Sequence, residues 1–485
     1  MTRWPVMTAL LLCSALPAGA AAQGFRGVAT TTVRSIEIRP LQLDTVPREE
    51  ATQLPDGSFE LDGIPLTCPP GLPCTYYRAL DSRRATLLSQ DVSLTAWGLG
   101  WTGVSATFAL RARADLGGEF EWPRSDDAFD AILAYAELNR DQWRVRLGRQ
   151  RTSGGLGFSG FDGASVLYEP IARTYVEAYG GRSLARGLYE PRHEALQGID
   201  DFVRDQNAYL IGIAAEAEPW TGTRVAARYQ REIWSDRSAL LSERASFDFA
   251  SNALAPVSID GSADYDFAFG RIGKMHVTAR SQVPFAPTIT VEATGRRYLP
   301  YFELWTIWGY FNPVAYHEVE LRASGGIAAA AVTAFGSYRA YEPHDAPVVF
   351  GGISDDAFRL GASARMTLPG GVVVDGGYTV ERGFGAYLST GDVTAGWTPR
   401  ERITVTVNGT ASQQIEEFRL GEGMVWGGGG AIDLTIGASS GVAVGLDVYR
   451  QTFDNRPGQP DWNQMRGWAV FRLGFGRDPG TAERD

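Results

Sequence analysis

Residues 131–168 read AILAYAELNRDQWRVRLGRQRTSGGLGFSGFDGASVLY, two alternating segments joined by a polar turn and followed by a glycine-rich loop and a third segment. Apolar residues occupy every other position around Tyr135 and Glu137, and again around Arg144 and Arg146 after the turn. A period of two is typical of β-strands that have one apolar and one polar face. We expect the apolar face to contact lipid and the polar face to line a wet interior.

The same alternation recurs along the whole chain. It is clearest over residues 402–412, where isoleucine and valine alternate with threonine and asparagine. Strict up-and-down parity gives about 22 strands, and weak segments near 163–181 and 240–252 leave room for 18 or 20, since such barrels favour even counts. The sequence therefore predicts an all-β fold, a transmembrane antiparallel up-and-down β-barrel of 18–22 strands with long external loops and short periplasmic turns.

A water-soluble sandwich or propeller is the alternative explanation of the pattern. No four-strand internal repeat is evident, and the polar faces carry many arginines. A charge on the lipid face near the membrane midplane would cost about 2–4 kcal/mol, which explains why these arginines share the polar parity. The pattern favours the membrane barrel.

The ends of the chain predict its processing and assembly. Arg3, an apolar run over residues 7–16 and small residues over 18–22 indicate a cleaved signal peptide at 1–22. Residues 467–475 place apolar and aromatic side chains on one face, as in a closing strand presented to the barrel-assembly machinery. We therefore expect a single barrel over 23–476 in the outer membrane of a Gram-negative-type bacterium, surrounded by its lipid, and a short tail at 477–485.

Composition fits an exported barrel better than a nucleic-acid-binding protein. The chain is 44% hydrophobic with 57 glycines, and its formal net charge is −11. The mean hydropathy is −0.15, and no segment reaches the roughly 18 apolar residues of a transmembrane helix. Nucleic-acid binding requires a basic surface, so nucleic acid is not an expected partner.

The cysteines predict a disulfide. Cys68 and Cys74 lie in CPPGLPC, within the polar segment 45–82. In an exported chain this spacing indicates a small disulfide-closed loop, whereas a metal site would need a second ligand pair. We interpret 45–82 as a long, disulfide-stapled external loop; a periplasmic N-terminal extension is the alternative.

Motifs for catalysis, cofactors or metals are weak. Residues 155–160 fit GxGxxG, but a strand follows where a dinucleotide site needs a helix. No GxSxG is present, no serine partner can be named for His317, and the four histidines show no ligand spacing. The acidic segment 260–266 lacks the order of an EF-hand. We predict no enzyme activity, no cofactor and no metal.

Aromatic residues are densest over residues 298–313. Trp305, Trp308 and Tyr310 could belong to the aromatic girdle of a barrel. A stacking surface for a sugar is the alternative.

Three short segments resemble the alginate-export type of outer-membrane porin. They are residues 134–138 (AYAEL), 145–150 (VRLGRQ) and 161–163 (FDG), and the stretch 131–168 that contains them is about 40 residues of the chain. The resemblance implies an 18-stranded barrel that passes anionic polysaccharide through an arginine-lined pore. It also implies that Glu137 and the arginines Arg144, Arg146 and Arg149 are pore or loop residues.

The polar strand faces supply the candidate pore-lining residues. We expect arginines and acids to oppose each other across the lumen, with Glu137 beside Arg144 or Arg146. The candidates are Tyr135, Glu137, Arg144, Arg146, Arg224, Arg228, Glu292, Arg296, Glu318, Glu320, Arg322, Arg359 and Arg365.

Two hypotheses of function follow. The first is an outer-membrane porin for passive or substrate-biased passage of small hydrophilic solutes, including anionic or carbohydrate solutes. The second is a non-conducting structural or adhesive barrel whose loops bind a partner. The long segment 45–82 motivates the second hypothesis.

Overall fold

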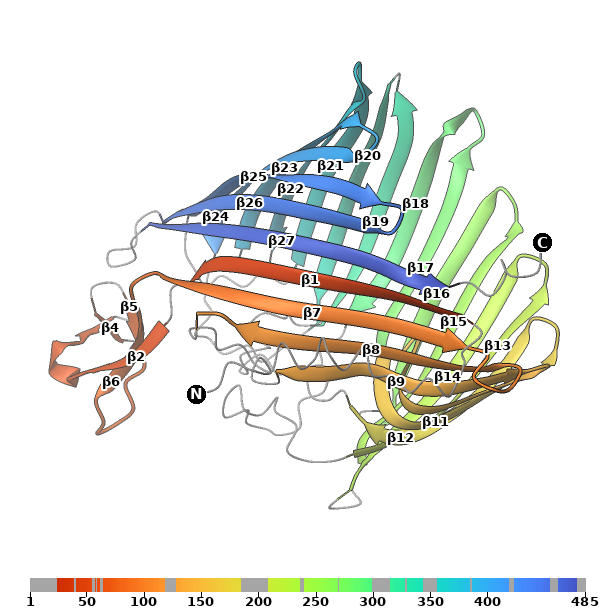
Figure 1. The fold of residues 1–485 in the computed structure, drawn as a ribbon. Coiled ribbons are helices and arrows are strands. Elements are labelled where there is room, and N and C mark those ends of the chain that lie inside the picture. The colour runs from red at the N-terminus through yellow and green to blue at the C-terminus, as the bar shows by residue number, and fades with distance from the viewer. Residues whose placement is uncertain are drawn as a thin grey trace.

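In the computed structural model the chain folds mainly into one β-barrel. The model describes residues 24–38, 41–54, 57, 59–61, 64–117, 128–184, 208–235, 240–268, 270–298, 315–327, 329–342, 356–383, 386–417, 423–453 and 461–477. Within them, 22 strands form one antiparallel sheet. The sheet closes because β1 (Gly24–Ile38) pairs with both β27 (Trp462–Arg477) and β7 (Arg83–Trp97) (Figure 1).

Each of the remaining strands pairs with its neighbours in chain order, in an up-and-down arrangement. In that order they are β8 (Val104–Asp115), β9 (Phe129–Arg140), β10 (Trp143–Gly154), β11 (Gly157–Ile171), β12 (Thr174–Ser183), β13 (Ala208–Trp220), β14 (Thr223–Trp234), β15 (Leu240–Leu254), β16 (Val257–Asp266), β17 (Arg271–Val283), β18 (Ala286–Tyr298), β19 (Tyr316–Ile327), β20 (Ala330–Tyr341), β21 (Asp356–Leu368), β22 (Val372–Gly383), β23 (Ala386–Arg400), β24 (Ile403–Glu417), β25 (Gly423–Gly437) and β26 (Ser440–Phe453).

The predicted all-β barrel with an even strand number is confirmed. The two segments that looked weak in the sequence form full strands, β11 and β12 over 163–181 and β15 over 240–252. The closing strand expected at 467–475 is β27, which completes the barrel against β1. The 22 strands differ from the 18 implied by the resemblance to alginate-export porins.

The two ends of the barrel have connections of different length. Short turns lie at the end where β1 begins and β27 ends, for example 141–142, 172–173 and 221–222. At the opposite end consecutive strands are separated by more residues of the chain, as between the end of β12 at Ser183 and the start of β13 at Ala208. Connections at the two ends alternate along the chain because consecutive strands run antiparallel, and the connection 155–156 is short although it lies at the end with the longer connections.

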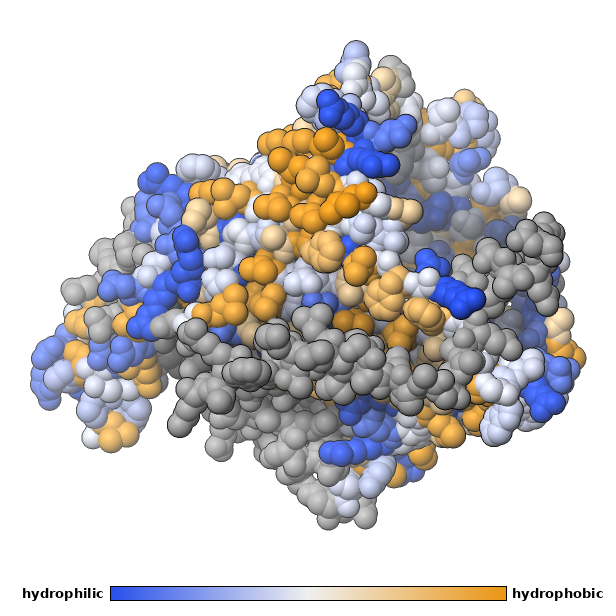
Figure 2. All heavy atoms as spheres, in the orientation of Figure 1, coloured by the Kyte–Doolittle hydropathy of each residue, from blue (hydrophilic) through white to orange (hydrophobic). Residues whose placement is uncertain are grey.

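The alternation of the sequence separates an inner from an outer face. Contacts between non-adjacent strands identify the inner face, as where Asn408 of β24 donates to Asp447 of β26 at 3.4 Å. On β19, Glu318 and Glu320 of the inner parity are 2% and 5% exposed, whereas Val319 and Leu321 of the outer parity are both 59% exposed. Apolar side chains gather over the strands that face the viewer in Figure 2.

Aromatic residues mark both ends of the outer face. Trp143 stacks on Tyr168 at 4.2 Å between ring centroids, at the end with the short turns. Trp397 lies near the same end, and Tyr338 and Trp426 lie toward the opposite end, all about half exposed. The apolar residues of the outer face lie between these two rows of aromatic residues. This arrangement is typical of transmembrane barrels.

A small appendage connects β1 to β7 (Figure 1). It comprises β2 (Leu41–Val46) paired with β6 (Cys74–Ala79), a 3-10 turn (Arg48–Glu50), and a three-stranded sheet of β3 (Thr52–Gln53), β4 (Phe59–Leu61) and β5 (Ile64–Leu66).

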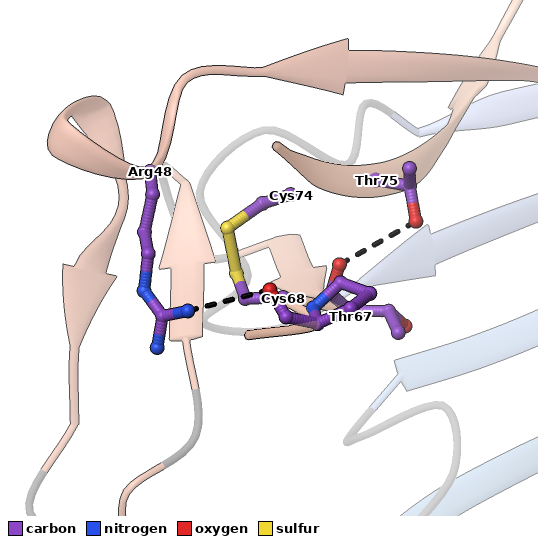
Figure 3. Close-up of a disulfide and its surroundings, with 6 residues drawn as sticks. Arg48, Thr67, Cys68, Cys74 and Thr75 are labelled. Atoms are coloured by element: carbon purple, nitrogen blue, oxygen red, sulfur yellow. Dashed lines mark hydrogen bonds between the residues drawn. A yellow bond between two sulfur atoms is a disulfide. The ribbon is translucent and has the colours of Figure 1, made fainter. Parts of the chain in front are cut away.

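The predicted disulfide joins Cys68 to Cys74 within this appendage. Beside it Arg48 donates to the carbonyl of Pro69 at 3.4 Å, and Thr75 donates through its hydroxyl to the carbonyl of Thr67 (Figure 3). The appendage therefore has its own sheets and cross-link, at the end of the barrel with the long connections.

Some sequence predictions fall outside the described residues: the signal peptide at 1–22, the tail after residue 477, and the aromatic residues Trp305, Trp308 and Tyr310. Among the described residues, no helix is long and apolar enough to cross a membrane.

Candidate functional site

An ion-pair ladder runs across the inner face of β18–β22. Arg296 contacts Glu318 at 3.0 Å and Glu320 at 3.1 Å, and Arg322 contacts Glu320 at 2.8 Å. Arg339 bridges Glu318 to Glu381, which it contacts at 2.6 Å. The inward parity of five neighbouring strands, spaced about 4.8 Å apart, brings these side chains together. The ladder places guanidinium and carboxylate groups of five strands side by side on the inner wall.

Aromatic rings support the cations of this ladder. The guanidinium of Arg339 lies 5.1 Å from the ring of Tyr316. The guanidinium groups of Arg322 and Arg359 lie 5.3 Å and 5.1 Å from the centre of the Phe335 ring. Cation–π contacts of this kind stabilise and orient guanidinium groups. The rings thus hold the cations against the wall.

In the part of the chain that the structure describes, the acids expected to face arginines across the lumen form ion pairs along the wall. The acids named for that role pair with arginines within the wall, including Glu292 with Arg280 at 2.5 Å. Arg365 lies 3.8 Å from Asp375, and Arg359 lies 3.8 Å from Glu381. The cause is the ladder register, which sets an acid and an arginine on adjacent strands.

Near Tyr135, Glu137 forms an ion pair with one of the two arginines named for it in the sequence analysis. Glu137 of β9 pairs with Arg146 of β10 at 2.6 Å, and Arg146 lies 5.1 Å from the ring of Tyr135. Arg144 takes no part in this pair.

The position of Arg149 differs from the pore position that the resemblance to alginate-export porins implies. It shares the outer parity of Leu147, which is 59% exposed, and pairs with Asp162 of β11 at 2.7 Å. A strict alternation places residue 149 on the side opposite to residues 144 and 146, so Arg149 is not on the pore side of the strand.

The β10–β11 hairpin folds into the barrel at its glycine-rich tip. Arg228 of β14 donates to the Thr152 hydroxyl and, at 2.8 Å, to the carbonyl of Ser153. Ser159 donates to Gln230 of β14 at 3.1 Å. Strands β11 to β13 separate β10 from β14 in the sheet, so these contacts cross the inner face.

Below the tip, Phe161, Tyr179 and Leu210 form a buried apolar cluster. Figure 1 shows the strong curvature of the wall at β11 and β12.

Close approach explains the glycines of the tip. A Cβ on Gly154 would lie 2.8 Å from Nε of Arg228. A Cβ on Gly155 would lie 2.6 Å from a carboxylate oxygen of Asp248 and 2.7 Å from Oγ of Ser246. The glycine-rich motif, which resembled a nucleotide-binding loop, therefore permits contact between the hairpin tip and the inner faces of β14 and β15.

A cavity of about 610 Å³ lies between this tip and the inner faces of β10–β15. Three arginines and three acids line it, together with Leu167 and Tyr175. The charged residues are Arg144, Arg224, Arg228, Glu177, Glu216 and Asp248. Arg224 donates to both oxygens of Glu216 at 2.6 Å. The cavity brings together three of the predicted site residues: Arg144, Arg224 and Arg228.

One side-chain constellation was not visible in the sequence. His276 Nδ1 lies 2.9 Å from the Ser262 hydroxyl, and His276 Nε2 lies 3.9 Å from Asp260. Ser262 and His276 face each other at a ladder position, where backbone N–H groups bond within the sheet and are not free to form an oxyanion hole. In the described part of the chain, no three acidic, histidine or cysteine side chains are grouped to hold a metal ion.

Sequence reasoning missed several inner-face residues, notably Arg339, Glu381, Glu177 and Glu216. Parity could have found them, because each shares the polar phase of its strand. The partners that Glu177 and Glu381 contact two strands away could not be found in this way, because the sequence of one strand does not determine its register with another.

No protein-family model matches the chain, and no curated protein matches it in sequence. Among solved structures, it is similar to OccAB1 from Acinetobacter baumannii, at 8% identity and a TM-score of 0.40, over 94% of this chain and 97% of that one. It is also similar to a ferric enterobactin receptor (PfeA) mutant from Pseudomonas aeruginosa, at 11% identity and a TM-score of 0.47, over 94% and 81%. OccK3 (OpdO) from Pseudomonas aeruginosa matches at 8% identity and a TM-score of 0.35, over 93% and 96%.

Proposed function

We propose that the chain is an outer-membrane channel for small hydrophilic solutes. The observation that carries the proposal is a closed barrel of 22 strands whose inner face bears ion pairs and whose outer face is apolar. Barrel diameter grows with strand number, and barrels of about 16–18 strands already leave an aqueous channel. A polar wall on a barrel of this size suits the passage of water and of solutes that hydrogen-bond.

The inner face favours solutes rich in oxygen. Each guanidinium presents several N–H donors in a planar fork, which suits carboxylates, phosphates and hydroxyl groups. The ladder of Arg296, Arg322, Arg339 and Arg359 provides four such forks on neighbouring strands. Anionic and carbohydrate solutes are therefore the finer classes that we propose for the channel, and the inner-parity candidates are its pore-lining residues.

The proposed location is the outer membrane of a Gram-negative-type bacterium. The exposed apolar residues of the outer face would contact lipid, and the aromatic rows would lie at the two membrane interfaces. The apolar face of β27 would be the signal for the barrel-assembly machinery.

Electrical conductance tests the proposal. Purified, folded protein is added to a planar lipid bilayer, with heat-unfolded protein as the control. Stepwise increases in conductance from the folded protein alone are expected. A folded barrel that inserts and never raises conductance would refute the channel.

The appendage between β1 and β7 favours a second candidate function. Its two small sheets and disulfide form a structured projection at one end of the barrel. A barrel that presents this projection to a partner would be an adhesive or structural component. That function requires partner binding to fall when both cysteines are replaced by serine, and unchanged binding would contradict it.

A further inference from the structure

The cavity beneath the β10–β11 hairpin contains charged groups that have no hydrogen-bond partner among the described residues. Two of its arginines already have partners: Arg224 donates to both oxygens of Glu216, and Arg228 donates to the hairpin. Arg144 also lines the cavity, and no hydrogen bond or ion pair joins its side chain to another residue in the described ranges. A free guanidinium in a cavity is a binding group for an anion.

The carboxylate of Glu177 lines the same cavity and has no hydrogen bond within the described ranges. The carboxylate of Glu177 has one ion-pair contact, Arg228 at 3.9 Å, and its side chain is 19% exposed. That distance is too long for a hydrogen bond. Glu177 therefore offers acceptor oxygens to a cation or to an N–H donor in the cavity.

Register fixes the spacing of the two groups. Arg144 of β10 faces Leu167 of β11, and Leu167 faces Glu177 of β12. With about 4.8 Å between neighbouring strands, the backbones of Arg144 and Glu177 lie about 10 Å apart, with an apolar side chain between them. Long side chains that start this far apart can converge on one small molecule.

We infer that this cavity binds a small zwitterion, with its carboxylate on Arg144, its ammonium on Glu177 and an apolar part on Leu167. Its volume of about 610 Å³ lies within the usual range for small-molecule sites, about 300–1,000 Å³. A simple anion would be repelled by Glu177, and a simple cation would be repelled by Arg144. The inference rests on the proposed channel, for which it specifies one substrate class.

Leucine and two analogues that each lack one charge test the inference. The probes are L-leucine, 4-methylpentanoate without the ammonium, and 3-methylbutylammonium without the carboxylate. Current through single full-length barrels in a planar bilayer is recorded at low salt with each probe. Leucine is expected to interrupt the current at concentrations at least about tenfold below those of either analogue, since one charged hydrogen bond is lost in each.

Arg144→Gln and Glu177→Gln are each expected to weaken occlusion by leucine about tenfold or more. Arg472→Gln is the matched control, because Arg472 lies on the inner parity of β27, outside the cavity, and has no partner in the described part of the chain. It should leave occlusion by leucine unchanged. Equal occlusion by leucine and 4-methylpentanoate, or no effect of Glu177→Gln, would overturn the inference.

The two proposals fail in different ways. A barrel that conducts but is not occluded by leucine overturns the zwitterion site alone. A barrel that does not conduct overturns the channel, and equilibrium dialysis of leucine against the detergent-solubilised protein then decides the site. Saturable binding that Arg144→Gln abolishes supports the site, and absence of binding overturns it.

Discussion

Removal of one carboxylate from the ladder should destabilise the barrel. The Glu318 side chain is 1% exposed and pairs with Arg296 and Arg339. Loss of one partner of a buried ion pair costs about 3–5 kcal/mol. In Glu318→Gln, however, Arg339 keeps Glu381 and Arg296 keeps Glu320. We therefore expect a loss of about 2–3 kcal/mol in the free energy of unfolding, just below that range.

Urea unfolding of the protein in phospholipid bilayers, followed by tryptophan fluorescence, measures this loss. Glu292→Gln makes the same chemical change in a pair whose side chains are 54% and 20% exposed, for which about 0.2–1 kcal/mol is expected. A lower midpoint for Glu318→Gln with an unchanged slope is the predicted result. Equal losses in the two variants would refute the assignment of a buried, coupled ladder.

Coupling within the ladder gives a second check on the same reasoning. Arg339→Gln should cost less in the Glu318→Gln background than in the wild-type protein, because its main partner is already neutral. Residues in one ion-pair network usually couple by about 0.5–3 kcal/mol. Strict additivity of the two changes would contradict the ladder.

Three further predictions concern the hairpin, the appendage and a strained glycine. Arg228→Gln removes the contacts that hold the hairpin tip, so conductance of single barrels should rise and protease should cleave within 153–156; unchanged conductance and resistance would contradict a held tip. Replacement of Cys68 and Cys74 by serine opens a loop with a sequence separation of 6, which should cost the appendage about 2.4 kcal/mol and leave barrel unfolding unchanged; an equal loss in the barrel would contradict its independence. Gly148→Ala places a Cβ 2.3 Å from the Ala134 carbonyl at a φ of +122°, so unfolding should become easier by more than about 1 kcal/mol; an unaltered urea midpoint would argue against strain there.

The alternation of apolar and polar residues predicted most of the fold. Period-two patterns predict strands, their even number and the face on which each side chain lies, because each face of a barrel wall has one environment. In the weak segment 163–181, Gly180 and Gly181 permit close packing against the backbone of the neighbouring strands, and glycines add nothing to the apolar signal. Strict parity would also have placed Arg149 outside, on the apolar side of its strand.

Contacts of the candidate site could be predicted only in part. The pair Glu137–Arg146 follows from a tight turn, so the sequence anticipates it. The contact of Arg228 with Thr152 joins residues 76 positions apart, and nothing local to either strand specifies it. Inward folding of a hairpin depends on three-dimensional complementarity, here between a glycine-rich tip and the inner faces of β14 and β15.

The polar face of each strand is proposed to be wet and the apolar face to contact lipid, and cysteine accessibility along β24 measures this alternation. Single cysteines replace Thr404, Val405, Thr406, Val407 and Asn408 in a chain whose three native cysteines are serine. A charged, membrane-impermeant thiol reagent is applied to the protein in phospholipid vesicles. Cysteines at 404, 406 and 408 are predicted to react and those at 405 and 407 to be protected. Equal reaction at all five positions, or the opposite alternation, would contradict the account.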